Sequence, residues 1–106
     1  MISMRCNTKL YASGDPFAYS LAYVLNDMVT VTPNHQGYNY YTSSPYPSSV
    51  VYGHAACYQG LFYSDCVTCV MSARDQVLNV CPMRIGAEVV RNDCKMRYEW
   101  YPFIDN

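Results

Sequence analysis

The stretch CYQGLFYSDCVTC, residues 57–69, places three cysteines at steps of nine and three residues. Such a run can bind a metal, carry out redox chemistry or form disulfides. The chain holds six cysteines in 106 residues, and the other three are Cys6, Cys81 and Cys94. An even and high cysteine count is typical of small secreted domains, because their thin hydrophobic cores need covalent links.

Length and charge narrow the class of protein further. A chain of 106 residues predicts a single domain spanning residues 1–106. The net charge is −1, which offers no basic field for a phosphate backbone, so we expect no nucleic-acid partner. No apolar run is long enough to span a bilayer, and the start MISMRCNT lacks the pattern of a signal peptide. If the protein is secreted, we expect this to be its mature form.

A first helix is predicted from Pro16 to a point before Pro33. Asp15 can accept hydrogen bonds from the first free backbone N–H groups, and proline suits the first helical position. Apolar residues then recur at steps of four, four and three and form one core-facing stripe: Phe17, Leu21, Leu25 and Met28.

The middle of the chain predicts two strands and a second helix. Residues 38–42 are strand-like, and residues 50–56 alternate between two faces, with His54 on one and Gly53 on the other. The second helix is expected from an N-cap at Ser64 to about Cys81, where Pro82 follows.

The last third predicts a hairpin turning at Asn92-Asp93, a pair that tolerates left-handed backbone conformations. In that register, Glu88 lies opposite Arg97 on the outer face, and we expect the two side chains to form a cross-strand ion pair. Because strands and helices follow one another without βαβ alternation, the fold class is predicted as α+β, an antiparallel sheet with the helices packed on it.

Two uses of the cysteines are disfavoured by their surroundings. Cys66 and Cys69 form a C-x-x-C at a helix start, but a thioredoxin-like site needs a βαβ context. A zinc site needs four ligands, whereas the chain has one close cysteine pair, and His35 and His54 have no second ligand at metal spacing. We therefore expect no metal or cofactor and three disulfides, with 15 connectivities open from spacing alone.

The cysteine pattern resembles a known family. The residues concerned are Cys57-x8-Cys66-x2-Cys69, the Cys6-Asn7 start and the segments SGDPF, YGHAAC, SDC, IGA and YE. Together they are similar to the plant salt-stress/antifungal domain, the ginkbilobin-like module. That module occurs singly in secreted antifungal proteins. It occurs in tandem in cysteine-rich repeat secretory proteins, plasmodesmata-located proteins and cysteine-rich receptor-like kinases.

The resemblance implies a five-stranded antiparallel sheet packed against two helices. It also implies the disulfide pairs, which are Cys6–Cys81, Cys57–Cys66 and Cys69–Cys94. The opening stretch would then link a strand end to the second helix, and that helix to the last strand.

The resemblance further implies a candidate glycan site. The family's founding antifungal lectin binds mannose through an asparagine, an arginine and a glutamate, which fall on Asn7, Glu88 and Glu99 here. Glu88 departs from that pattern, because a carboxylate accepts hydrogen bonds where an arginine donates them. We hypothesise that Arg97 supplies the missing guanidinium from the neighbouring strand. The alternatives are an exposed Glu88–Arg97 ion pair and a backbone-capping role for Asn7.

A second hypothesis is protein recognition. Tyrosine gives large contact area at low entropic cost, and seven tyrosines exceed what a small core needs: Tyr38, Tyr40, Tyr41, Tyr46, Tyr58, Tyr63 and Tyr101. No nucleophile–base arrangement is evident. We expect a secreted, non-enzymatic recognition module of the plant apoplast, acting in defence or stress signalling. Its partner would be a microbial effector, a receptor ectodomain, a second copy or a glycan, with a mannose-binding antifungal lectin as the alternative.

Overall fold

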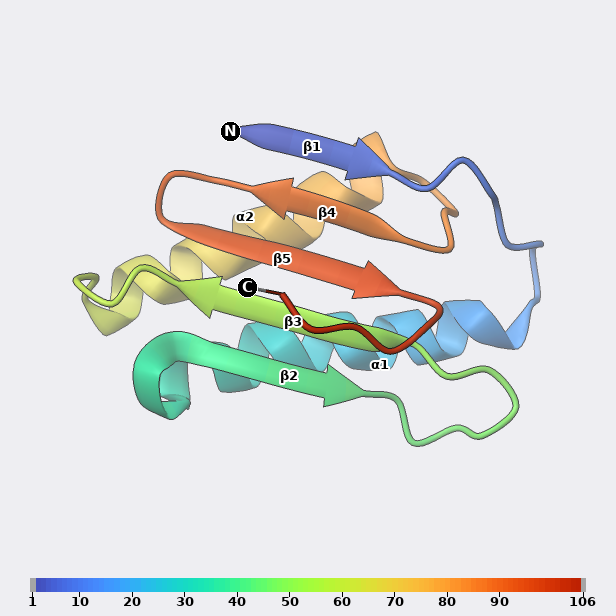
Figure 1. The fold of residues 1–106 in the computed structure, drawn as a ribbon, viewed down its shortest axis with the longest axis horizontal. Helices are drawn as coiled ribbons and strands as arrows, with labels where there is room; N and C mark the ends of the chain where they lie inside the picture. The colour runs from blue at the N-terminus through green and yellow to red at the C-terminus, as the bar shows by residue number, and fades with distance from the viewer. Residues whose placement is uncertain (1, 106) are drawn as a thin grey trace.

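The computed structural model describes residues 2–105 and has two helices and a five-stranded antiparallel sheet. The strand order is β1-β4-β5-β3-β2 (Figure 1). The elements are β1 (Ser3–Cys6), α1 (Pro16–Val31), β2 (Asn39–Ser43), β3 (Tyr52–Cys57), α2 (Tyr63–Val80), β4 (Ala87–Val90) and β5 (Cys94–Glu99), with short 3₁₀ turns at Thr32–Asn34 and Gln36–Tyr38. The predicted α+β class is confirmed.

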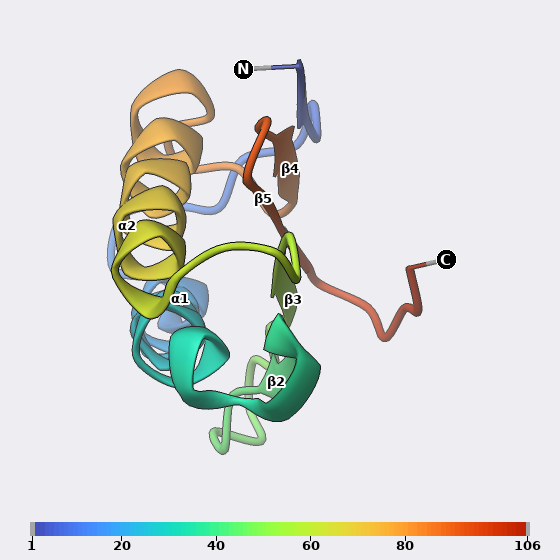
Figure 2. The ribbon, with the colours of Figure 1, turned by 90° about the vertical axis from the view of Figure 1, so that its left-hand side faces the viewer.

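Both helices cover the same face of the sheet. Figure 2 shows them on one side, with the segment that follows β5 on the other. We call the helix-covered side the inner face and the opposite side the outer face. Across residues 2–105, neither helix combines the length and apolar character needed to cross a membrane.

Helix α1 begins as the sequence predicts. The Asp15 carboxylate accepts from the Phe17 backbone N–H at 2.9 Å, and Pro16 is the first helical residue. The helix ends at Val31, ahead of Pro33, and its buried side chains are Phe17, Ser20, Leu21, Val24, Leu25 and Met28. The predicted apolar stripe is confirmed and is widened by Val24.

Helix α2 starts at Tyr63, two residues earlier than an N-cap at Ser64 would allow. The Phe62 carbonyl already accepts hydrogen bonds from the backbone N–H groups of Asp65 and Cys66, each at 3.1 Å. Ser64 therefore lies inside the first turn, and its carbonyl accepts from the Thr68 hydroxyl. The prediction of Ser64 as N-cap was wrong, because the backbone closes the first turn without a side-chain cap.

The register of the β4–β5 hairpin is confirmed. Ala87 pairs with Tyr98, and Val89 pairs with Met96. The Arg91 N–H donates to the Cys94 carbonyl at 2.8 Å and so closes the turn. The edge strand β1, which pairs with β4, had no alternation signal of its own and was not predicted from its residues.

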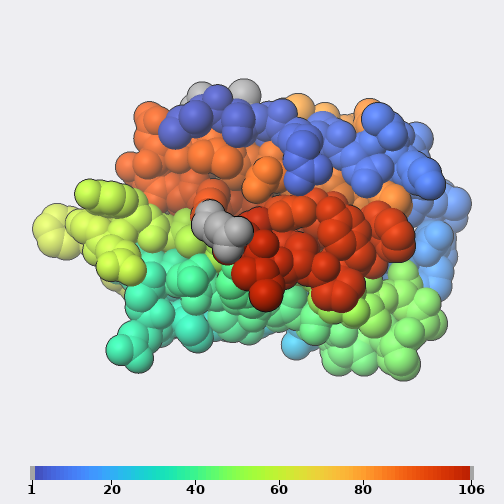
Figure 3. Space-filling view, viewed as in Figure 1, coloured from blue at the N-terminus to red at the C-terminus, as the bar shows by residue number. Residues whose placement is uncertain are grey.

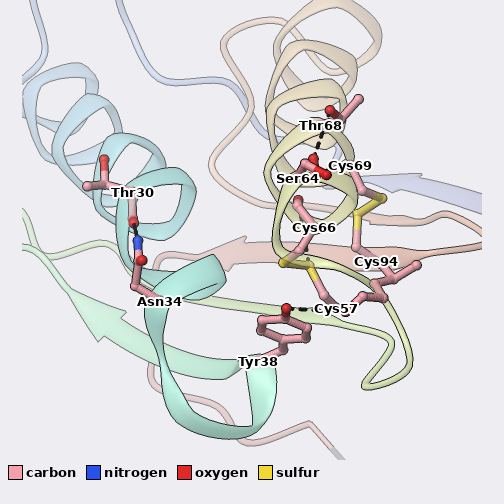
Figure 4. The surroundings of a disulfide bond; sticks show 10 residues. Thr30, Asn34, Tyr38, Cys57, Ser64, Cys66, Thr68, Cys69 and Cys94 are labelled. Atoms are coloured by element: carbon pink, nitrogen blue, oxygen red, sulfur yellow. Dashed lines mark hydrogen bonds between the residues drawn. A yellow bond between two sulfur atoms is a disulfide. The ribbon is translucent and has the colours of Figure 1, made fainter.

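Three disulfides attach α2 to the sheet. Cys66 and Cys69 lie in the first two turns of the helix, and Cys81 is its C-cap. Figure 4 shows two of the bonds at the start of α2. The bonds are Cys57–Cys66 to β3, Cys69–Cys94 to β5 and Cys6–Cys81 to β1, the pairs that the family resemblance implied. One helix is thus joined covalently to three strands.

Gly53 marks the closest approach of α1 to the sheet, which yields a first prediction. A Cβ added there would lie 2.5 Å from Val24 Cγ1 and 2.9 Å from Met28 Sδ. We expect Gly53→Ala to push α1 outward and to lower the free energy of unfolding by about 1–3 kcal/mol in urea denaturation. In the control Gly60→Ala, the added Cβ meets only the exposed Tyr58 ring, which can move, so we expect a change below about 0.5 kcal/mol. Equal effects would contradict this account.

The disulfides should differ in what they contribute to stability. Cys6–Cys81 spans 75 positions and Cys57–Cys66 spans 9. Because a longer closed loop restricts the unfolded chain more, replacing both cysteines of the long bond by alanine should cost roughly 2 kcal/mol more than doing so for the short bond. Urea denaturation measures the difference, and intact mass checks that the two remaining bonds persist. A larger loss from the short bond would refute the entropic explanation.

Candidate recognition face

One row of side chains crosses the whole outer face. The strand register aligns, from edge to edge, Arg5 on β1, Glu88 on β4, Arg97 on β5, His54 on β3 and Tyr41 on β2. We call these five residues the outer row. Charged and aromatic groups therefore lie side by side on the face that the helices leave uncovered.

Glu99 is the most buried charged group beside this row, with 1 % of its surface exposed. Its Oε2 accepts from Arg97 Nε at 2.8 Å and from Arg5 Nη2 at 3.0 Å. Its Oε1 has no hydrogen-bond partner among the described residues and points at Gly86, where a Cβ would collide with it. Two guanidinium groups thus compensate a carboxylate that burial alone would disfavour.

The expected ion pair between Glu88 and Arg97 is not formed within residues 2–105. Their backbones are opposite each other as predicted, but Glu88 Oε1 lies 3.7 Å from Arg5 Nε instead. Arg97 turns along its own strand to Glu99 and reaches Asp105 with Nη1 at 2.6 Å. Buried carboxylates attract the guanidinium more strongly than the half-exposed Glu88 does, because solvent screens them less.

Asn7 lies at the end of β1 and organises the backbone there. Its Oδ1 accepts from the Lys9 N–H at 2.8 Å, and its own N–H donates to the Gly86 carbonyl at 2.9 Å. Arg84 Nη1 donates to the Asn7 carbonyl at 2.9 Å. The side-chain oxygen of Asn7 is therefore used in a local turn, which is the capping role considered from the sequence.

His54, Arg97 and Asp105 form a compact cluster at the centre of the outer face. His54 Nδ1 lies 2.7 Å from Asp105 Oδ2, and its Nε2 lies 2.5 Å from Asn39 Oδ1. Burial lowers the pKa of His54 below its usual value and outweighs the opposing effect of Asp105. Burial alone would raise the pKa of Asp105, but hydrogen bonds from Arg97 and His54 prevail and lower it. Asp105 is thus held between a guanidinium and an imidazole.

Arg97 stays charged in this cluster. Burial disfavours its charged form, but the hydrogen bonds to Glu99 and Asp105 outweigh burial and raise its pKa above the ordinary arginine value. The guanidinium also lies 4.0 Å from the centre of the Phe103 ring and donates to the Tyr101 hydroxyl at 3.2 Å.

Arg5, His54, Phe103 and Asp105 belong to this face but were absent from the sequence-derived site. Alternation in residues 50–56 did place His54 on the strand face opposite Gly53, which was the one available signal, but it did not say which of the two faces is the outer one. The contacts of Phe103 and Asp105 depend on how the segment after β5 folds back, which no local pattern indicates.

The seven predicted tyrosines do not gather on one surface. Tyr41 and Tyr101 lie on the outer face, whereas Tyr46 packs edge-on against Tyr19 and Tyr23 of α1. Tyr58 and Tyr63 are exposed near the start of α2. The remaining two are partly buried, with hydroxyls bonded to protein: Tyr38 to the Leu61 carbonyl and Tyr40 to Asp27.

The chain is similar to antifungal proteins and to the ectodomains of receptor-like proteins. It is 34 % identical to an antifungal ginkbilobin-like protein of Picea abies, over 96 % of this chain and 94 % of the relative. It is 35 % identical to the antifungal protein ginkbilobin-2 of Ginkgo biloba, over 96 % and 77 %.

Among solved structures, it resembles the tandem DUF26 ectodomain of the Arabidopsis thaliana cysteine-rich receptor-like protein PDLP8. The TM-score is 0.87 at 28 % identity, over 94 % of this chain. Our chain spans 48 %, about half, of that tandem ectodomain. The family model for salt stress response/antifungal proteins matches residues 5–101. The chain therefore belongs to the salt stress response/antifungal family.

Proposed function

We propose that this chain is a secreted, non-enzymatic recognition module of plant defence or stress signalling that binds a protein partner through its outer face. Membership of an antifungal family supports the defence role. Three disulfides support an oxidising, extracellular location such as the apoplast.

The observation that carries this proposal is the outer row. Five side chains of mixed charge and aromatic character are aligned by the sheet register on the face that no helix covers. Disulfides join three of these five strands to a common helix, and the other two strands pair with them, so little entropy is lost when a partner binds. Charge complementarity along such a row favours one partner over others.

The absence of catalysis is also part of the proposal. His54 is the histidine that lies on the outer face. Both of its ring nitrogens are engaged, one with Asp105 and the other with Asn39, and 2 % of its surface is exposed. Such a histidine is not available to take a proton from a nucleophile.

Charge reversal in the outer row tests the protein-binding proposal. Receptor ectodomains of the family and secreted fungal proteins would be screened against the immobilised chain. For a partner so found, we expect Glu88→Lys to weaken binding about tenfold or more, because it inverts a charge at the row. The control Tyr19→Ser changes a side chain on α1 that is 78 % exposed and should leave affinity unchanged. A partner that responds to neither variant, or equally to both, does not use this face.

A mannose-type glycan is the second candidate ligand. The observation in its favour is that two guanidinium groups, of Arg5 and Arg97, meet the Glu99 carboxylate close to Asn7. Arg97 is mostly buried, whereas the Arg5 side chain is 49 % exposed. Arg5 is therefore the arginine that can donate to sugar hydroxyls. It would take the role of the lectin's arginine, whose position is occupied by Glu88 in this chain.

Mannose titration followed by NMR tests this alternative. We expect saturable shifts at Arg5, Asn7 and Glu99, and we expect Arg5→Ala to weaken binding about tenfold or more by removing a charged donor. Arg74→Ala on α2 is the control, because Arg74 pairs with the exposed Asp75 away from this face. If the wild-type chain shows no saturable shift at millimolar mannose, the glycan alternative is withdrawn.

A further inference from the structure

Residues 100–105 lie across the outer face and cover its centre. Figure 3 shows this segment in red between the N-terminal residues and the β2–β3 side of the sheet. The segment has no regular secondary structure and does not extend the sheet. It is held through a carboxylate, a backbone unit and an aromatic ring.

The carboxylate is that of Asp105, and two neighbouring strands bind it. Arg97 Nη1 lies 2.6 Å from Oδ1, and His54 Nδ1 lies 2.7 Å from Oδ2. Exposed fractions of the side chains are 10 % for Asp105, 17 % for Arg97 and 3 % for His54. The guanidinium of Arg97 and the imidazole of His54, at paired positions of β5 and β3, thus contact both oxygens of one carboxylate.

The backbone and ring contacts involve Tyr41 and Arg97. The Tyr41 hydroxyl accepts from the Asp105 N–H at 2.9 Å and donates to the Asp105 carbonyl at 3.1 Å. The Phe103 ring lies against the Arg97 guanidinium and 6.4 Å from the Tyr41 ring. Tyr41 itself is fixed by stacking on His54, with ring centres 4.0 Å apart. Together, these side chains bind the backbone and the carboxylate of Asp105. They also contact the ring of Phe103, two positions earlier in the chain.

The residues that form this surface keep other partners when the segment leaves. Arg97 retains Glu99, and His54 retains Asn39. Between Phe103 and Asp105, the Ile104 side chain is 81 % exposed, so the segment adds little to the core. Local opening of such a segment costs far less than global unfolding.

From these contacts we infer that Tyr41, His54 and Arg97 form a binding site for a partner peptide that carries an aromatic residue two positions before a carboxylate, and that the chain's own Phe103–Asp105 occupies this site as an internal competitor. The inference deepens the proposed function and rests on it, since it names the chemistry of the protein partner and the place where it docks.

A peptide titration of the full chain tests the inference. The probe is YPFID-amide with fluorescein on its N-terminus, which repeats residues 101–105 and keeps the Asp105 carboxylate, and its binding is measured by fluorescence anisotropy. In the wild type the internal segment competes at an effective concentration of about millimolar. In Phe103→Ala/Asp105→Asn the internal segment has lost its ring and charge contacts. We therefore expect this variant to bind the probe about tenfold or more tightly than the wild type does.

Three controls make the result specific. The variant Phe62→Ala/Asp93→Asn removes one aromatic ring and one carboxylate outside the site and should bind like the wild type. Probes with Phe replaced by Ala, or Asp by Asn, should bind the Phe103→Ala/Asp105→Asn chain about tenfold more weakly. Adding Tyr41→Phe to that chain removes the hydroxyl while keeping the ring, and should weaken binding as well.

Equal affinity of the wild type and the Phe103→Ala/Asp105→Asn chain overturns the inference. So does equal binding of all probes, or no binding by a variant whose thermal unfolding shows that it is folded. These outcomes are separate from a failure of the proposed function. If a protein partner binds through Glu88 but the peptide probe does not bind, only the inferred peptide site is refuted. If Glu88→Lys changes the binding of no partner but the probe binds as expected, the peptide site stands and the proposed use of Glu88 is refuted.

Discussion

The covalent attachment of α2 to three strands is the constraint on which the rest of this structure depends. Cys66 and Cys69 connect the start of the helix to β3 and β5, and Cys81 connects its end to the edge strand β1. A chain of this size buries a smaller share of its surface than a larger domain does, so the covalent links add to the stability that packing provides. Because the helix is bonded at both ends, the positions of the strands relative to one another are set by covalent geometry as well as by the core.

Because both helices lie on the inner face of the sheet, the outer face can be polar. Helices pack on the inner face alone, so the outer face has no apolar layer to complement, and charged groups can be aligned along it. Even so, the buried Glu99 requires two guanidinium groups, and Arg97 is shared between Glu99 and Asp105. Arg97 therefore links the electrostatics of the sheet to the position of the segment that follows it.

Membership of one family does not fix one role. The chain is similar in sequence to an antifungal protein and in fold to a tandem receptor-like ectodomain, of which it spans about half. In the proposed function, recognition depends on the side chains of the outer face. In this chain those side chains include a glutamate at position 88 and an exposed arginine at position 5.

The sequence by itself determined the start of α1 at Asp15-Pro16, the stripe of that helix and the hairpin register of β4 and β5, because caps, periodicity and turns act over a few residues. The even count of six cysteines indicated disulfides, whereas their pairing was implied by the family resemblance. It located Glu88, Arg97 and Glu99 on the outer face but misassigned the ion pair. Only the tertiary structure decided that Arg97 binds Glu99 and Asp105, that Arg5 joins them, and that Asp105 reaches His54 and Tyr41, which lie 51 and 64 positions away. Such contacts depend on how distant strands and a returning segment meet in space, and no local periodicity encodes that geometry.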